Sequence, residues 1–256
     1  MGLAAKLVLA LCFFAGGAAN FGGNKPASCV SFALGLALAL WGARDVALAR
    51  RKRCSPEPEP SPERHDGGAV SICRADYSRI NDLYKYVVLD VETTGLDRRR
   101  DRIVRLAWIT YTRYSVTGSY ATFVNPGMHI PEAATRINGI TDRDVRFAPT
   151  YEKVRPRVAG ALAGATVVGH NVGFDLDFTH DMLSGCGVIR FIDTLDLAKR
   201  AFPGLKSYSL SSLCRELSIE VPGDVHPQLR GAYAANELFT RCRLELYKQG
   251  KARRSR

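Results

Sequence analysis

The sequence lacks the cysteine patterns that bind structural zinc or carry dithiol chemistry. Its 256 residues include seven cysteines, and no two of them form a CxxC pair. They are spread without a zinc-like cluster at positions 12, 29, 54, 73, 186, 214 and 242. No internal repeat is visible either. The composition therefore predicts neither a zinc site nor a CxxC redox site, and a reduced protein facing the cytosol is the simplest account.

Acidic residues are scarce relative to basic ones. The sequence has 25 Asp and Glu against 36 Lys and Arg, which gives a formal net charge of +11. This balance suits a polyanionic partner such as nucleic acid or an anionic membrane surface, and charge alone does not choose between them. With 46% hydrophobic residues, the chain has room for one ordinary domain plus appendages.

Two hydrophobic stretches near the N-terminus, residues 3–19 and 27–43, hold much of the apolar content. Each is close to the roughly 17 to 25 residues that cross a bilayer core. The basic cluster at 50–53 favours a membrane hairpin with both ends in the cytoplasm, by the positive-inside rule. A cleaved signal peptide is the alternative for the first stretch. We therefore expect residues 1–53 to anchor the chain at the inner (cytoplasmic) membrane, with the following domain facing the cytoplasm.

Residues 54–83 are predicted to be a linker and a lead-in to that domain. Residues 55–63 read Ser-Pro-Glu-Pro-Glu-Pro-Ser-Pro-Glu. Proline fixes φ and removes backbone donors, and the acids repel one another, so this run favours an extended spacer. It would hold the following domain off the membrane.

From residue 84 the pattern predicts alternating strands and helices. Three strands joined by short turns predict an antiparallel meander at 86–92, 103–111 and 119–125. Further strands are expected at 165–170 and 191–193, and helices at 131–137, 149–162, 174–183, 210–217 and 228–247. Residues 84–248 should therefore form an α/β domain, a mixed central sheet flanked by helices, with a basic tail at 249–256.

Two carboxylates interrupt the first of these strands. Asp90 and Glu92 stand at i and i+2, so both leave the same face of the strand. Burying two like charges side by side is costly unless something positive lies between them, and a divalent metal is the usual compensation. The alternative is a strand end whose acids reach water.

Asp175 and His226 are further polar positions of interest. Asp175 lies where a strand passes into a helix, a common place for sites in α/β sheets, although a helix-start acid stabilised by the dipole is the alternative. His226 precedes Pro227 at the start of the last helix. For this histidine an exposed cap is the alternative to a catalytic role.

Taken together, these residues resemble the DEDDh 3'–5' exonuclease family, typified by the proofreading subunit of bacterial DNA polymerase III. The resemblance covers roughly residues 84–247. It is carried by five motifs in the family's order, at 90–96, 137–145, 170–175, 192–195 and 208–210. It implies a ribonuclease H-like fold and two-metal hydrolysis at the 3' ends of DNA or RNA.

The resemblance also implies a role for each site residue. Asp90, Glu92 and Asp175 would hold two divalent cations, Mg²⁺ or Mn²⁺, since hard cations prefer carboxylate oxygens. His226 would be the general base for the attacking water. The 3'-terminal nucleotide would be bound by Thr93, Gly95, Leu96 and Phe174, with a core role as the alternative for Phe174.

Gly231 departs from the family pattern. The family's last motif places an aspartate five residues after the histidine as the fourth metal ligand, and here that position is glycine. Arg230 adds positive charge beside the gap. We therefore expect weak, Mn²⁺-favoured hydrolysis or none, in a domain that still binds nucleic-acid ends.

Three functions are consistent with this sequence. The chain could be a membrane-tethered exonuclease, a catalytically impaired module that retains the 3'-end pocket, or an interaction platform for a polymerase or membrane partner. The presence of all three acids and of His226 opposes long neglect of the site, and Gly231 argues the other way. The sequence indicates no particular protein partner.

Overall fold

The computed structural model describes residues 69–113 and 115–254. The chain divides into two units, and these residues all belong to the second, Glu57–Arg256. The predicted membrane spans at 3–19 and 27–43 lie outside the described residues and stay predictions. Within the described part, no helix combines the length and the apolar character that crossing a membrane requires.

A six-stranded sheet forms the centre of the described unit. Its strands are β1 (Ser71–Arg74), β2 (Lys85–Thr93), β3 (Ile103–Thr112), β4 (Val116–Phe123), β5 (Thr166–Gly169) and β6 (Val188–Asp193). Their order across the sheet is β1-β6-β5-β2-β3-β4. Strands β2, β3 and β4 pair antiparallel, whereas β2, β5, β6 and β1 pair parallel. The predicted α/β class, with its mixed sheet and antiparallel meander, is confirmed.

Strand β1 begins the sheet earlier than the expected domain boundary at residue 84. Its four residues pair in parallel with β6, and none of their side chains is buried. A strand held mainly by backbone pairing gives no hydrophobic alternation in the sequence, so these residues had been assigned to the lead-in. The fold therefore includes part of the segment 54–83.

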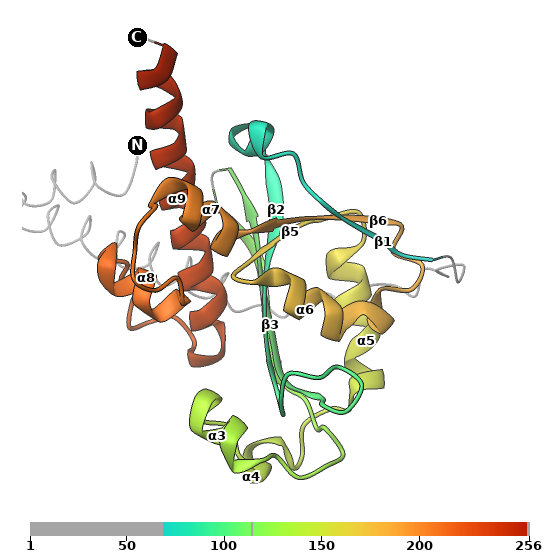
Figure 1. Ribbon diagram of the computed structural model, residues 1–256. Helices are drawn as coiled ribbons and strands as arrows, with labels where there is room; N and C mark the ends of the chain where they lie inside the picture. Colours follow the sequence, from blue (N-terminus) through green and yellow to red (C-terminus); the bar gives the residue numbers. More distant parts are fainter. Residues whose placement is uncertain (1–68, 114, 255–256) are drawn as a thin grey trace, which may run out of the picture. The chain divides into compact units, whose positions relative to one another are not determined.

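Helices cover both faces of the sheet (Figure 1). They are η1 (Tyr77–Asp82), α3 (Glu132–Asn138), α4 (Asp142–Val145), α5 (Tyr151–Leu162), α6 (Val172–Thr179), η2 (His180–Leu183), α7 (Thr194–Ala201), α8 (Leu210–Glu216), η3 (Pro227–Leu229) and α9 (Arg230–Arg254). Helices α7, α8 and α9 lie on one face, and α5 and α6 on the other (Figure 1). Helix α9 continues into the tail that was expected to be a solvated end.

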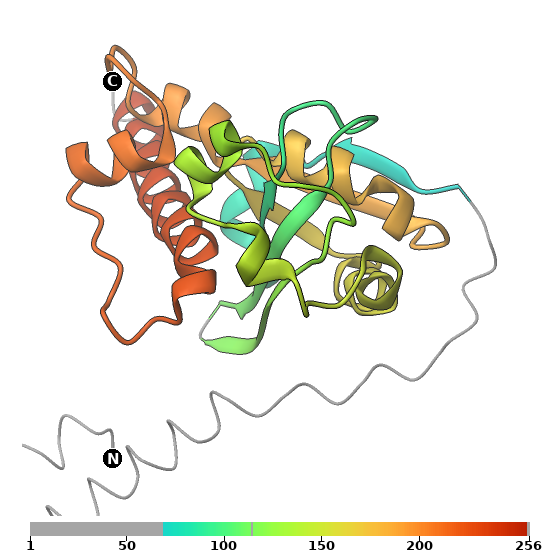
Figure 2. The ribbon, with the colours of Figure 1, turned by 90° about the horizontal axis from the view of Figure 1, so that it is seen from below.

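The alternation of side chains along β2 decides which layer its acids face. Val87 and Leu89 pack in the core beneath α5 and α6, while Val88 packs in the core beneath α7 and α9. Asp90 and Glu92 continue the second series, because side chains two apart share a face. Both acids therefore point to the α9 side. The end of β2 that carries them is the end near α3 and α4 (Figures 1 and 2).

Candidate active site

The acids of β2 are joined by an arginine from the neighbouring strand. Arg105 lies directly opposite Glu92 in the antiparallel ladder of β2 and β3. Its Nη2 donates to Asp90 Oδ2 at 2.9 Å and to Glu92 Oε1 at 3.1 Å. The three side chains are only 15%, 23% and 30% exposed for Arg105, Asp90 and Glu92. One guanidinium nitrogen therefore compensates both carboxylates within a partly buried site.

Burial opposes the ionised form of both acids. Desolvation raises the pKa of Asp90, and the Arg105 guanidinium acts in the opposite direction. Desolvation also raises the pKa of Glu92, helped by the charge of Asp90 and opposed by Arg105. The pair therefore depends on a nearby cation to remain charged near neutral pH.

Asp175 joins this group from the opposite layer. It lies in the first turn of α6 and is 6% exposed. Its Oδ1 accepts a hydrogen bond of 2.8 Å from the backbone N–H of Val91, the residue between the two β2 acids. Burial, and then the charge of Asp90, raise the pKa of Asp175 well above its ordinary value of 3.8. The three carboxyl groups are thus brought together around β2.

Helix α9 closes the site beside Asp90. Gly231 is the second residue of this helix, and a Cβ atom built on it would lie 2.5 Å from Asp90 Oδ2 and 2.8 Å from Oδ1. Such distances are shorter than van der Waals contact. Any side chain at position 231 would therefore displace the Asp90 carboxylate from its present position.

His226 is not joined to the acids. It is exposed and forms the N-cap of η3, where its Nδ1 accepts a hydrogen bond of 3.3 Å from the N–H of Gln228. Between residues 69 and 254, excluding 114, no hydrogen bond or ion pair connects it to Asp90, Glu92 or Asp175. Its geometry in this structure is that of the cap weighed above as the alternative.

The loop that follows β2 is ordered by its own polar contacts. Thr93 is buried, and its hydroxyl donates to the carbonyl of Gly95 at 2.5 Å. The carboxylate of Asp101 accepts from the N–H of Asp97 at 2.9 Å and lies so close that a Cβ on Gly95 would be 2.4 Å from it. Leu96, at the tip, is 86% exposed. The loop therefore holds an unburied leucine on a fixed backbone.

Phe174 lies apart from this loop's exposed surface. It is half-buried, its ring centroid is 4.8 Å from that of Phe178, and it packs against the core beneath α5 and α6. The structure thus gives Phe174 the core contacts weighed above as its alternative. The remaining predicted nucleotide-binding residues, Thr93, Gly95 and Leu96, are contiguous.

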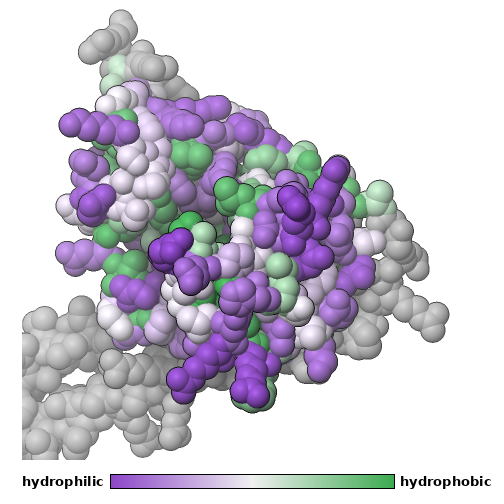
Figure 3. Space-filling model, turned by 60° about the horizontal axis from the view of Figure 1, so that its bottom comes forward, coloured by the Kyte–Doolittle hydropathy of each residue, from purple (hydrophilic) through white to green (hydrophobic). Residues whose placement is uncertain are grey.

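The surface around the site mixes basic and apolar side chains. The loop after β2 carries exposed arginines at 98, 99, 100 and 102. Ile137 and Phe147 are 87% and 89% exposed, in α3 and after α4. Seen from this end, hydrophilic side chains surround a hollow in which hydrophobic surface is visible (Figure 3). Such a surface suits an anionic chain with apolar bases.

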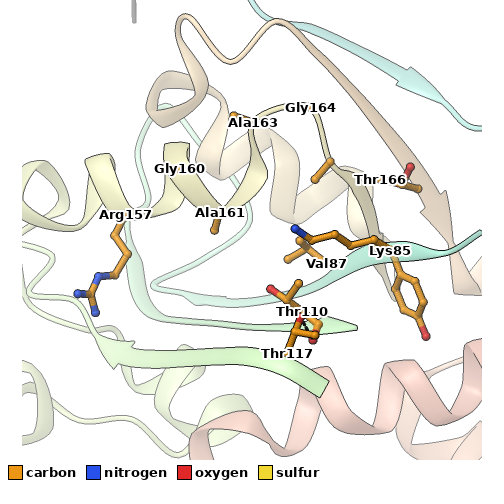
Figure 4. Close-up of a pocket in the computed structure, with 12 residues that line it drawn as sticks. Lys85, Val87, Thr110, Thr117, Arg157, Gly160, Ala161, Ala163, Gly164 and Thr166 are labelled. Carbon is orange, nitrogen blue, oxygen red and sulfur yellow. Dashed lines mark hydrogen bonds between the residues drawn. The ribbon is translucent and has the colours of Figure 1, made fainter. Parts of the chain in front are cut away.

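A separate cavity of about 590 Å³ lies beneath α5, lined among others by Lys85, Thr110 and Arg157 (Figure 4). Lys85 begins β2, whereas Glu92 is close to its end. At about 3.3 Å per residue these positions are about 23 Å apart along the strand. The cavity contains none of the predicted site residues.

The comparisons with known proteins agree with this fold and site. A family model described as Exonuclease (RNase T type) matches residues 87–239. DNA polymerase III subunit epsilon of Aquifex aeolicus is 33% identical over 166 residues, which are 63% of this chain and 82% of that protein. The 3'-5' exonuclease DinG of Bacillus subtilis is 32% identical over 140 residues, which are 53% of this chain and 15% of DinG. The chain belongs to the exonuclease family.

A solved structure also matches the fold. The complex of E. coli exonuclease I with a dT13 oligonucleotide aligns with a TM-score of 0.54 at 20% identity, covering 66% of this chain and 42% of that chain. This chain therefore spans most of the epsilon subunit, and much less than half of DinG and exonuclease I.

Exonucleases of this family normally use divalent metal ions. The residues present do not fit such ions as they stand. Arg105 takes one oxygen of each β2 acid, Asp175 gives one oxygen to Val91, and Gly231 offers no ligand atom. Over the described ranges, no three His, Cys, Asp or Glu side chains form a group that could hold a metal ion.

Arg105 was not predicted as a site residue. A signal for it is present in the sequence, because it is the one charged residue in the otherwise apolar run Ile103–Ile109. A charged side chain in a buried strand is almost always paired. Its partner could not be identified without the strand register.

Proposed function

We propose that this chain binds the 3' ends of DNA or RNA at the end of β2 and hydrolyses them weakly or not at all. The observation that carries the proposal is the Arg105 guanidinium lying between Asp90 and Glu92, where two-metal hydrolysis would need a divalent cation. The ordered loop with exposed Leu96 and its arginine-rich rim support binding of a nucleic-acid end. A related exonuclease was solved with a dT13 oligonucleotide, and we infer the same class of ligand here.

Two-metal hydrolysis with Mg²⁺ or Mn²⁺ is the second candidate function. The convergence of Asp90, Glu92 and Asp175 favours it, because the fold itself does not require three acids around one strand. Glycine at position 231, where the family pattern has its fourth ligand, opposes it. A full-length chain that degrades a 3'-labelled strand with Mn²⁺, and loses this activity in Asp90→Ala, would establish hydrolysis over binding alone.

Leu96→Ala is expected to weaken 3'-end binding about 10-fold, since covering a leucine side chain contributes roughly 1.5–3 kcal/mol. Fluorescence anisotropy of a 3'-labelled single-stranded oligonucleotide with the full chain measures this, with EDTA present to stop hydrolysis. Leu244→Ala is the matched control, because Leu244 is also exposed, at 52%, but lies far along α9. Equal affinities for the two variants would contradict the assignment of the loop.

We also propose that residues 1–53 tether the domain to the inner membrane, with the domain facing the cytoplasm. The support is in the sequence: two apolar stretches of spanning length followed by the basic cluster at 50–53. Deleting residues 1–53 is expected to move the chain from the membrane pellet to the soluble fraction after cell lysis. A deleted chain that still sediments with membranes after a high-salt wash would count against the tether.

A further inference from the structure

We propose that Arg105 is a built-in cation that takes the place of the divalent metal at Asp90 and Glu92, so that this site holds no catalytic metal. The inference rests on the proposed function, because it concerns the same site. It assigns Arg105 a role that none of the motifs implies: it keeps the two carboxylates charged and folded without metal.

The sheet itself delivers the cation. Glu92 and Arg105 are direct partners in the antiparallel ladder, and Asp90 lies two residues from Glu92 on the same face. The guanidinium therefore reaches the acids from a strand whose register is fixed by its pairing on both sides, with β2 and with β4. A single nitrogen, Nη2, lies within hydrogen-bond distance of both acids, which is the position that a bridging cation would need.

The other sides of Asp90 are closed in a matching way. The α9 backbone at Gly231 lies so near that a Cβ atom would be 2.5 Å from Asp90 Oδ2, the oxygen that accepts from Arg105. On the opposite layer, Asp175 uses Oδ1 to accept from Val91 and is almost fully buried. The glycine and the arginine thus act together, one omitting a ligand and the other supplying a positive charge.

This arrangement predicts that restoring an aspartate at position 231 is insufficient alone. Its Cβ would meet the Asp90 carboxylate while Arg105 still holds that group, and it would add a fourth acid to a site with one positive charge. Metal binding should return only when Arg105 is also replaced. The variant pair to compare is Arg105→Gln and Arg105→Gln with Gly231→Asp.

The test is Mn²⁺ binding by the full chain, followed by the electron paramagnetic resonance signal of free Mn²⁺ and by melting temperature. Wild type should bind Mn²⁺ at least about 100-fold more weakly than the double variant, a loss at the upper end of, or beyond, the 10–100-fold seen when groups supporting a metal are removed. The melting temperature of Arg105→Gln should rise by about 5 °C or more with Mn²⁺, and that of wild type by about 1 °C or less. Adding Asp90→Asn to either variant should abolish the gain.

Wild type alone decides the matter if the variants do not fold. Mn²⁺ binding by wild type that disappears in Asp90→Asn would overturn the proposal, whereas binding that is the same in both, or absent from both, supports it. Oligonucleotide binding in EDTA is measured on the same samples. Its absence would refute the proposed function and leave the Mn²⁺ result valid by itself.

Discussion

Arg105→Gln is expected to lower the free energy of unfolding by about 3 kcal/mol at pH 8, because removing one partner of a mostly buried ion pair leaves uncompensated charge. The effect is large since Asp90 and Glu92 both lose the same partner. Urea denaturation in EDTA, followed by circular dichroism, measures the loss. Arg136→Gln is the control, because the ion pair of Arg136 with Glu132 is 71% and 88% exposed and should contribute within about 0.5 kcal/mol.

The loss in Arg105→Gln should shrink as the pH falls. Burial already raises the pKa values of Asp90 and Glu92, and removing the guanidinium removes the influence that lowers them. A carboxyl whose pKa is raised by folding binds more protons in the folded state, so stability falls as the pH rises through that range. The destabilisation should therefore be smaller at pH 5 than at pH 8. A variant as stable as Arg136→Gln at pH 8 would contradict the compensating role of Arg105.

Asp175→Asn is expected to raise the free energy of unfolding by about 1–3 kcal/mol at pH 8 in EDTA, since it removes a buried ionisable group while keeping an acceptor. The amide oxygen can still accept from the N–H of Val91, whose bond to Asp175 Oδ1 is 2.8 Å. Wild type must either ionise this buried acid or keep its proton at alkaline pH, and both cost stability. Urea denaturation across pH 5 to 8 measures the difference.

The sign of the pH dependence follows from the raised pKa of Asp175. The unfolded carboxyl titrates near 3.8, whereas burial and the charge of Asp90 keep the folded carboxyl protonated to well above that value. Wild type should thus lose stability as the pH rises from about 4 through the folded pKa, and Asp175→Asn should lose less. Asp177→Asn, an exposed change on the same helix, should change neither quantity. A less stable Asp175→Asn at every pH would show that the charge of Asp175 is compensated.

Much of the fold could be predicted because its signals are local. The apolar runs and short turns of residues 84–125 predict the meander, and alternation along β2 puts Asp90 and Glu92 on one face. Strand β1 and helix α7 could not be predicted in this way. The side chains of β1 are hardly buried, so only its backbone pairing with β6 defines it.

The candidate site divides along the same line. The spacing of Asp90 and Glu92 and the position of Asp175 at a helix start were readable in the sequence, because each depends on a few neighbouring residues. Gly231 was readable as a missing acid. Its contact with Asp90 was not, since the two are joined only when α9 packs on the sheet. His226 was identified by its motif, yet its place as an exposed cap is a tertiary result.

The sequence by itself determined the class of fold, the family and the three acids, because periodicity and motif order are properties of contiguous segments. Only the tertiary structure decided what compensates those acids. Arg105 is 13 residues from Glu92 along the chain, and its meeting with both carboxylates depends on the register of β2 against β3. Register is set by turn geometry and by burial of both faces together, so no single stretch of sequence specifies it.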